Sequence, residues 1–255
     1  MKFNFKSKIL TFLFTSLIYI SGCDEQPVTD KIVVINIHNY DREKIAQQIQ
    51  NIIKLNPKVI ALDIQFSSRK DERIDSLLRA TLQSCDNLVM ASVIKDYTYE
   101  NNNYQDTLGC HPYFLNHAST GFVNVVVEND KFHSLKRFSI KESVNGKIEY
   151  HFAVRTAMMF DSLKAMSFIK NKPKLIDVSY QKDQSKFQTI SANKALEGSL
   201  SRADIEGKVI LFGTFYIFED NPDIFVSSLN KETEEYKPDM WGVMYHANII
   251  AQILE

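Results

Sequence analysis

Residues 31–64 read KIVVINIHNYDREKIAQQIQNIIKLNPKVIALDI and contain two continuous apolar runs joined by a periodic segment. The runs at 31–37 and 59–64 are apolar at neighbouring rather than alternate positions, which is typical of strands covered on both faces. Between them lie apolar side chains at the spacing of one helix face: Ile45, Ile49, Ile52 and Ile53. Asp41 is placed to cap this helix, and Asn56-Pro57 to end it. The stretch therefore predicts a strand, a helix and a second strand parallel to the first.

The same alternation of strands and helices continues to the end of the chain. Further continuous apolar runs stand at 88–94 and 209–213. Two more helix faces are marked by Ile74, Leu77, Leu78 and Leu82, and by Val243, Ala247, Ile250 and Leu254. Residues 121–127 and 135–140 flank a polar turn and predict an antiparallel hairpin, with a helix to follow around 152–159. We predict a single α/β domain with a mainly parallel sheet, flanking helices and an antiparallel hairpin insertion.

The first 30 residues predict export to the cell envelope. Lys2, Lys6 and Lys8 precede an apolar run at 9–20, which fits a signal-peptide core better than the roughly 20 residues of a membrane span. The run ends in ISGC (20–23), which resembles the lipobox of bacterial lipoproteins. We therefore expect a signal peptide at 1–22, a lipidated Cys23, a tether to the membrane at 23–30 and the folded domain at 31–255. An uncleaved signal anchor over 3–20 is the alternative, and it also leaves the domain outside the cytoplasm.

Charge and glycine content exclude several function classes. The 30 Lys and Arg against 31 Asp and Glu give a net charge of -1, so we expect no nucleic-acid partner. The chain has only 8 glycines and neither of the glycine-rich loops that cradle phosphates, so we expect no cofactor. His111 and His117 lack helical spacing, and no C-x-x-C pair occurs, so we expect no metal centre. Export permits a disulfide between Cys85 and Cys110, and unpaired thiols, one buried and one at the surface, are the alternative.

Polar residues gather at one edge of the predicted sheet. Ligands of open parallel sheets bind beyond the carboxyl ends of the strands. Those ends carry Asn36, His38, Asp63, Lys95 and Thr214. Two long connections, 96–117 and 215–241, leave the same edge, and the second carries Glu219, Asp220 and Asp223. Long connections in a compact domain are often functional, so we expect the ligand site here.

Asp63 and His246 are the sharpest single candidates. A carboxylate that ends an apolar strand must find water, a cation or hydrogen-bond donors, although Asp63 could equally cap the turn or helix at 65–72. His246 lies beside the apolar stripe of the last helix, where a packed, hydrogen-bonded histidine is the simpler interpretation. No G-x-S-x-G elbow supports a nucleophilic serine, so the residues give no positive evidence of catalysis.

Several motifs stand in a recognisable order. VIALDIQF (59–66) is followed by a helix with Asp71 and Asp75, and GFVN (121–124) by Asp130, Arg137 and the helix start FA (152–153). EGKVILFG (206–213) is followed by Asp220 and GVMYHA (242–247). Over about residues 31–254 this order resembles the type-2 CHASE domain, the extracellular sensing module of bacterial adenylate cyclases and histidine kinases.

The resemblance implies a sensory domain without enzymatic activity. The chain departs from the family at Asn36 and His38, where acidic residues are usual, and at Trp241, where proline is common. Family members usually continue into membrane helices and an output domain, whereas this sequence ends at Glu255. We therefore expect a small ligand at Asn36, His38, Asp63, Asp220 and His246, and a separate membrane signalling protein as partner.

Two alternatives stay open at this point. The same fold could act as an envelope interaction module that takes no small ligand. It could also be a hydrolase with Asp63 as base and His246 as its orienting partner, which requires the two side chains to meet within hydrogen-bond reach.

Overall fold

The computed structural model describes residues 28–100, 102–115, 117–180, 186–215, 217–218, 221–229 and 238–255. The expected signal peptide, Cys23 and Asp220 lie outside the described residues, so these expectations stay predictions. The end of the expected tether forms a short 3-10 helix, η1 (Val28–Lys31), which contacts α8 and β1. Within the described segments, no helix is long and apolar enough to cross a bilayer.

The molecule is built on a nine-stranded sheet whose central part is parallel. The parallel strands are β11 (Gln188–Ile190), β1 (Ile32–Asn36), β12 (Val209–Gly213), β2 (Val59–Leu62), β3 (Leu88–Thr98) and β5 (Ser119–Phe122), neighbours in that order. The strand, helix and strand predicted at 31–64 are β1, α1 (Arg42–Ile53) and β2. Strand β12 pairs between β1 and β2, so the segment at 206–213 completes the centre of the sheet.

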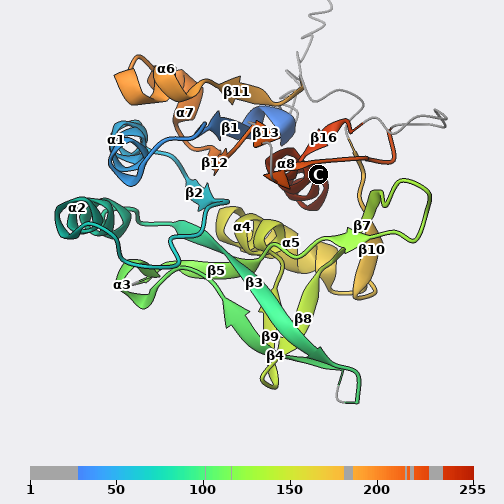
Figure 1. Ribbon diagram of the computed structural model, residues 1–255. Helices are drawn as coiled ribbons and strands as arrows, with labels where there is room; N and C mark the ends of the chain where they lie inside the picture. The colour runs from blue at the N-terminus through green and yellow to red at the C-terminus, as the bar shows by residue number, and fades with distance from the viewer. Residues whose placement is uncertain are drawn as a thin grey trace, which may run out of the picture.

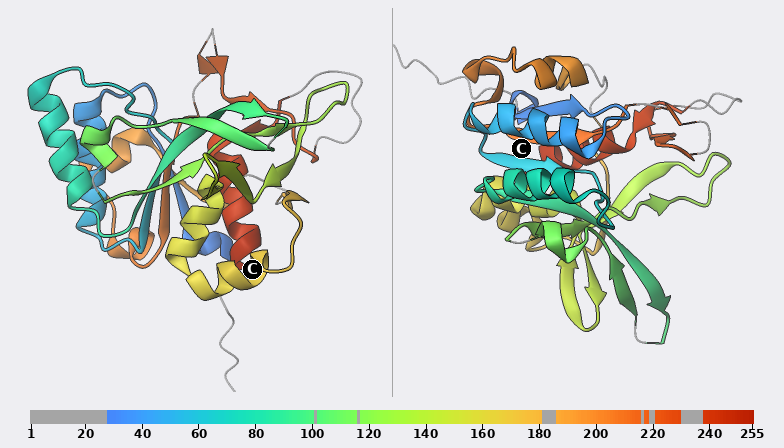
Figure 2. Two further views of the ribbon diagram at one scale, coloured as in Figure 1. Left: turned by 90° about the horizontal axis from the view of Figure 1, so that it is seen from below. Right: turned by 60° about the vertical axis from the view of Figure 1, so that its left-hand side comes forward.

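Helices cover both faces of the parallel strands (Figures 1 and 2). One face carries α1, α2 (Glu72–Gln83), α3 (Pro112–Leu115), α6 (Ala192–Glu197) and α7 (Arg202–Ile205). The other carries α4 (Phe152–Phe160), α5 (Ser162–Ile169) and α8 (Gly242–Leu254). Val33 and Ile35 enter the first core, whereas Ile32 and Val34 enter the second. Because successive strand residues point to opposite faces, the runs are continuously apolar, as predicted.

The antiparallel hairpin is confirmed, but it starts later than the sequence predicts. It joins β6 (Val126–Val127) to β7 (Leu135–Ser139), and β10 (Leu175–Asp177) pairs with the other edge of β7. Gly121 belongs instead to β5 in the main sheet. A Cβ on Gly121 would lie 2.6 Å from the Cα of Phe152, so this glycine lets β5 pass against the start of α4.

The connection at 96–117 is not an open loop, which corrects the sequence prediction. Strand β3 runs on to Thr98 and turns back as β4 (Asn103–Leu108), which pairs antiparallel with it. Strands β8 (Lys141–Val144) and β9 (Lys147–Tyr150) continue this sheet beside β4. We call β4, β8, β9 and the outer half of β3 the arm; it extends away from the helices in Figure 1. Packed tyrosine rings explain why this polar segment forms strands, since Tyr97 contacts Tyr99 and Tyr104.

Helix α8 runs antiparallel to the central strands and is buried along most of its length. Its first turn abuts the end of β12, where a Cβ on Gly213 would lie 2.5 Å from the side chain of Val243. Two short ribbons precede it: β13 (Ile217–Phe218) with β14 (Asn221–Pro222), and β15 (Ile224–Phe225) with β16 (Met240–Trp241). The far end of α8 lies at the edge of the sheet where η1 enters β1. The helix therefore spans the domain from the carboxyl edge of the sheet to the edge nearest the N-terminal segment.

Candidate ligand-binding cleft

A cavity of about 430 Å³ lies at the carboxyl ends of β2, β3 and β5, beside the first turn of α8. Its walls are formed by Asp63, Val93, Val123, Asn124, Val125, Asp223, Phe225, Gly242 and His246. This is the edge at which open parallel sheets bind ligands, as the sequence predicts. The volume suits a small molecule.

Asp63 follows directly after β2, and the backbone fixes it at the floor of the cleft. Its N–H donates to the carbonyl of Phe212 on β12 at 2.9 Å. The side chain is only 16% exposed, and its carboxyl oxygens accept no hydrogen bond from the described part of the chain. The capping role that Asp63 could have had belongs to Asp71, whose side chain accepts from the N–H of Ile74. Burial, and to a smaller extent the charge of Asp223, raises the pKa of Asp63 from 3.8 to about 7.

A second carboxyl group, that of Asp223, enters the cleft from the segment before β15. Its backbone carbonyl accepts from the N–H of Gly242 at 3.2 Å, which fastens this segment to the start of α8. A Cβ at position 242 would lie 2.4 Å from Oδ1 of Asp223, so only glycine lets the carboxyl group pack here. Burial raises the pKa of Asp223 to about 6. Two desolvated carboxyl groups therefore share one cavity.

His246 closes the wall between Asp63 and the core. It is 3% exposed, and its Nε2 lies 3.8 Å from Oδ2 of Asp63, which is too long for a hydrogen bond. Its Nδ1 is buried without a hydrogen-bond partner among the described residues. Burial lowers the pKa of His246 to about 3, so the ring is neutral at neutral pH and forms no ion pair with Asp63. The histidine is packed, as the sequence predicts, but it lacks the expected hydrogen bond.

A second buried histidine stands behind the first. The ring centroids of His151 and His246 are 5.2 Å apart, and burial, followed by His246, lowers the pKa of His151. The Nδ1 of His151 accepts from the N–H of Ala153 at the start of α4, so the proton of the neutral ring is assigned to Nε2. That Nε2 is buried and has no partner in the described segments. The wall behind the carboxyl groups is thus neutral.

The rest of the cleft is apolar or already paired. Val93, Val123, Val125 and Phe225 present hydrocarbon to the cavity. Asn124 is polar, but its side chain accepts from the N–H of Ile94 at 2.8 Å and donates to the carbonyl of Ile94 at 2.9 Å. Its amide therefore extends the edge of β3, and these two bonds fix its orientation.

Asn36 and His38 lie at the same edge of the sheet but do not join this cleft. Oδ1 of Asn36 accepts from the N–H of His38 at 2.9 Å and from the N–H of Phe215 at 3.3 Å, which ties the ends of β1 and β12 together. His38 is exposed, with a backbone φ of 53°, and lines a different cavity. The structure thus brings Asp63 and His246 together and places Asn36 and His38 elsewhere.

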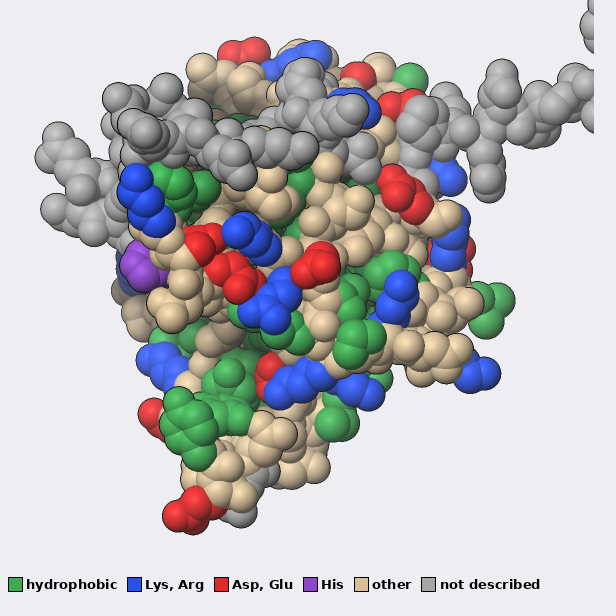
Figure 3. Space-filling model, turned by 90° about the vertical axis from the view of Figure 1, so that its right-hand side faces the viewer, with side chains coloured by type: hydrophobic (Ala, Val, Ile, Leu, Met, Phe, Trp, Pro, Cys, Tyr) green, Lys and Arg blue, Asp and Glu red, His purple; other side chains and the backbone are tan. Residues whose placement is uncertain are grey.

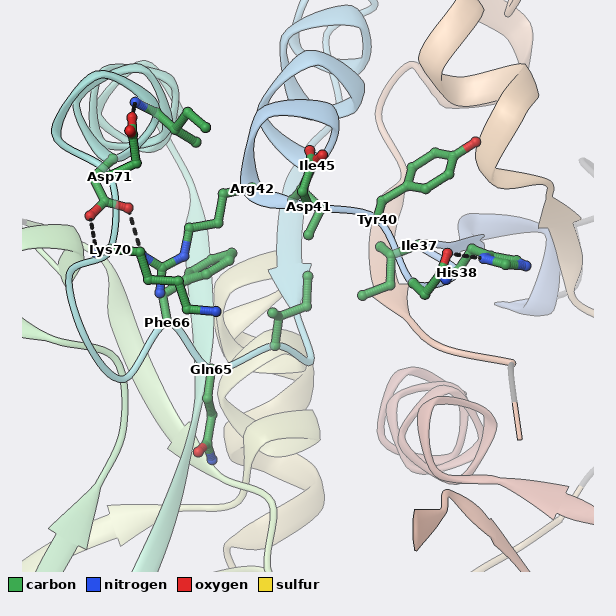
Figure 4. A pocket seen from close by; sticks show the side chains of 14 residues that line it. Ile37, His38, Tyr40, Asp41, Arg42, Ile45, Gln65, Phe66, Lys70 and Asp71 are labelled. Atoms are coloured by element: carbon green, nitrogen blue, oxygen red, sulfur yellow. Dashed lines mark hydrogen bonds and ion pairs between the residues drawn. The ribbon is translucent and has the colours of Figure 1, made fainter. Parts of the chain in front are cut away.

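That different cavity, of about 550 Å³, lies between the first turns of α1 and α2 (Figure 4). Arg42 reaches across it from α1 toward Phe66 and Lys70. Its guanidinium is 2.5 Å from the buried carboxylate of Asp75 and donates to the carbonyl of Ser68 at 2.6 Å. This cavity is larger than the first. Because its guanidinium charge is already neutralised within the protein, it carries a weaker signal for a ligand.

Cys85 and Cys110 are both buried and unbridged. Sγ of Cys110 accepts from the N–H of Phe66 at 3.2 Å, inside the core under α1 and α2. Burial raises the pKa of the Cys85 thiol to about 12. The disulfide alternative is thus not realised, and Cys110 is in the core and not at the surface.

The geometry of the site indicates a class of protein. It is a concave, desolvated cleft on a doubly covered α/β sheet, and the base and histidine that a hydrolase would need stop short of a hydrogen bond. This arrangement suits binding better than catalysis.

The family model of the CHASE2 domain matches residues 4–255, essentially the whole chain. The chain therefore belongs to the CHASE2 domain family, a family of extracytoplasmic, non-catalytic sensory domains. No curated protein and no solved structure matches the chain. The resemblance seen in the order of the sequence motifs is thereby confirmed.

Asp223 belongs to a long connection that the sequence places near the site, but no sequence signal singles it out. Three acidic residues stand close together at 219–223, and nothing local distinguishes the one that turns into the cleft. The informative signal is distant, since Gly242 is the residue that makes room for the Asp223 carboxyl group. His151 was missed because it precedes α4 and meets His246 only in the folded chain.

Proposed function

We propose that this chain is an extracytoplasmic sensory domain that binds a small ligand in the cleft of Asp63, Asp223 and His246. One observation carries the proposal: two desolvated carboxyl groups share a concave site, and neither accepts a hydrogen bond from the described residues. Such groups destabilise a folded protein unless a partner compensates them, and they cluster at functional sites. Membership of a sensory family supports the same conclusion.

The proposed signal passes to a separate membrane protein through the ends of α8. The ligand would touch the first turn of this helix and the Asp223 segment attached to it. The other end of α8 lies beside η1, just after the segment that we expect to carry the lipid anchor at Cys23. A bound ligand that draws the Asp223 segment inward would change the surface near the cleft, and a rigid helix would carry a shift to the edge facing the membrane.

Thermal unfolding of the full chain in detergent micelles tests ligand binding. The panel comprises amines, amino acids, sugars, nucleotides, organic acids and divalent cations. A ligand at about 100 times its dissociation constant adds roughly 2.7 kcal/mol, which raises the midpoint of a domain of this size by about 5 to 10 °C. We expect one compound class to produce this shift in the wild type and in the exposed control Asp86→Asn, and to lose it in Asp63→Asn. A flat panel would refute the small-ligand proposal.

A second candidate is an envelope interaction module without a small ligand, and the arm is the observation that favours it. Tyr99, at the tip of the arm, is 89% exposed, and Ile148 on β9 and Leu108 on β4 are 52% and 42% exposed. Figure 3 shows hydrophobic side chains gathered on the lower part of one face, over the arm. Site-specific photo-cross-linking from position 99 in the envelope would recover one stoichiometric partner under this alternative.

A further inference from the structure

We propose that the cleft of Asp63, Asp223 and His246 takes a small molecule with a protonated amine on an apolar body, and that its binding releases a proton. The inference rests on the proposed function, since it names the class of ligand for the same site.

The polar groups of the cleft are complementary to a positively charged hydrogen-bond donor. Among the described residues that line it there is no Lys or Arg, and two carry carboxyl groups. The amide of Asn124 is held by Ile94, and His246 is neutral. An anionic ligand would bring a like charge against both carboxyl groups in a poorly hydrated site, whereas an ammonium group supplies N–H donors and the opposite charge.

The apolar walls specify the rest of the molecule. Val93, Val123 and Val125 present hydrocarbon to the cavity, and Phe225 adds an aromatic ring. A bare, strongly hydrated ion would gain nothing from these walls, while an alkyl or aryl amine would bury its carbon skeleton against them. The cavity of about 430 Å³ has room for a molecule of this size.

A divalent metal ion fits the same residues less well. Calcium takes six to eight oxygen ligands, and magnesium demands near-octahedral oxygen geometry. In the segments that the structure describes, no three His, Cys, Asp or Glu side chains are arranged to hold a metal ion. The two carboxyl groups are therefore better matched to an organic cation.

Proton release follows from the two carboxyl groups that share the cleft. The pKa values of about 7 for Asp63 and about 6 for Asp223 mean that the pair holds a proton near pH 6 to 7. An ammonium group favours the ionised carboxylates and displaces that proton. His246 faces the pair from α8 and His151 stands behind it at α4, and both stay neutral over this range because burial lowers their pKa values. The pH dependence of binding therefore belongs to the two carboxyl groups.

Isothermal titration of the full chain in detergent micelles tests the inference, with butylamine and benzylamine as probes. Their neutral isosteres are butanol and benzyl alcohol, and their anionic counterparts are butyrate and benzoate. Alkylamines titrate near pH 10, as lysine does, so butylamine and benzylamine stay largely protonated at about pH 5 and about pH 8. We expect an amine to bind at least about tenfold more tightly at the higher pH, with the neutral isostere showing no such dependence. Near pH 6 to 7, buffers of different ionisation enthalpy should report a proton released on binding.

Variants localise the effect and separate it from the proposed function. Asp63→Asn should abolish both amine affinity and its pH dependence, and Asp223→Asn should weaken both, while Asp86→Asn at the opposite edge of the sheet leaves them unchanged. Binding of Mg²⁺ or Ca²⁺, or of the neutral or anionic probes, that is lost in Asp63→Asn would overturn the amine inference and leave the sensory site intact. Amine binding that survives Asp63→Asn would also overturn it. If no probe and no compound of the unfolding panel binds, both proposals fail.

Discussion

Replacing Asp63 with asparagine should stabilise the protein at neutral and alkaline pH. The pKa of this carboxyl group rises from 3.8 in the unfolded chain to about 7 in the fold, chiefly because the group is buried. The folded state therefore binds the proton more tightly than the unfolded state does. The stability of the wild type should be highest when Asp63 is protonated, and should fall as the pH rises from about 4 to about 7.

The magnitude follows from the size of the shift. Each pKa unit corresponds to about 1.4 kcal/mol, so a shift of about 3 units destabilises the fold by about 4 kcal/mol above pH 7. Asparagine keeps the shape of the side chain and never ionises. Asp63→Asn should recover up to about 4 kcal/mol at about pH 8, equivalent to a rise of about 10 °C in the unfolding midpoint, and close to nothing at about pH 4.

Urea unfolding at both pH values measures this difference. The single tryptophan, Trp241, is a convenient probe because it precedes the first turn of α8 beside the cleft. The control Asp86→Asn removes a carboxylate from an exposed position and should change stability little at either pH. If the difference in stability between Asp63→Asn and wild type were the same at both pH values, the reasoning would be refuted. A variant less stable than wild type at the higher pH would refute it as well.

Two further predictions concern the frame that holds the cleft. Gly121→Ala should lower the free energy of unfolding by about 3 kcal/mol, because its Cβ would lie 2.6 Å from a backbone atom of Phe152. In the control Gly109→Ala, the nearest neighbour of the new Cβ would be a side-chain atom at 3.3 Å, so the loss should be less than about 1 kcal/mol. Urea titration of both variants checks the difference. Arg42→Ala should lower the free energy of unfolding by about 3 kcal/mol or more, because it leaves the 1%-exposed carboxylate of Asp75 unpaired; an unchanged midpoint in calorimetry would contradict this.

The fold could be predicted from the sequence wherever its determinants are local. The cap at Asp41 is confirmed, with its side chain accepting from the N–H of Lys44 at 2.9 Å. The predicted stop is confirmed as well, since α1 ends at Ile53 and Asn56 adopts a φ of 59°. A helix that begins and ends on its own signals needs no knowledge of distant residues.

The sequence does not predict a strand correctly where its boundaries depend on a distant partner. The run GFVNVVV looks like one strand, but its first half pairs with β3 and its second half with β7. The division is set by the contact of Gly121 with Phe152, about 30 residues away in sequence, which no local pattern reveals. The connection at 96–117 is hard to predict as strands for a similar reason, because β4 is polar and mostly exposed and is held by pairing with β3 and by tyrosine contacts.

The candidate site residues also differ in whether their position can be predicted from local sequence. Asp63 and His246 can be proposed from the sequence because each is a polar residue in an apolar run, which is a local signal. Asn36 ends a strand at the same edge, but its side chain is used by two backbone N–H groups nearby. Asp223 enters the cleft through its attachment to Gly242, so its role depends on the folded arrangement and not on its neighbours in sequence.

The most direct test of the central claim is a methyl NMR spectrum of the valine-labelled protein, recorded with the compound that gives the largest thermal shift. Val93, Val123 and Val125 line the cleft, whereas Val33 lies in the core under α1 and α2. We predict that the compound shifts the methyl signals of the three cleft valines, leaves that of Val33 in place, and has no effect in Asp63→Asn. Shifts confined to valines outside the cleft would contradict the account.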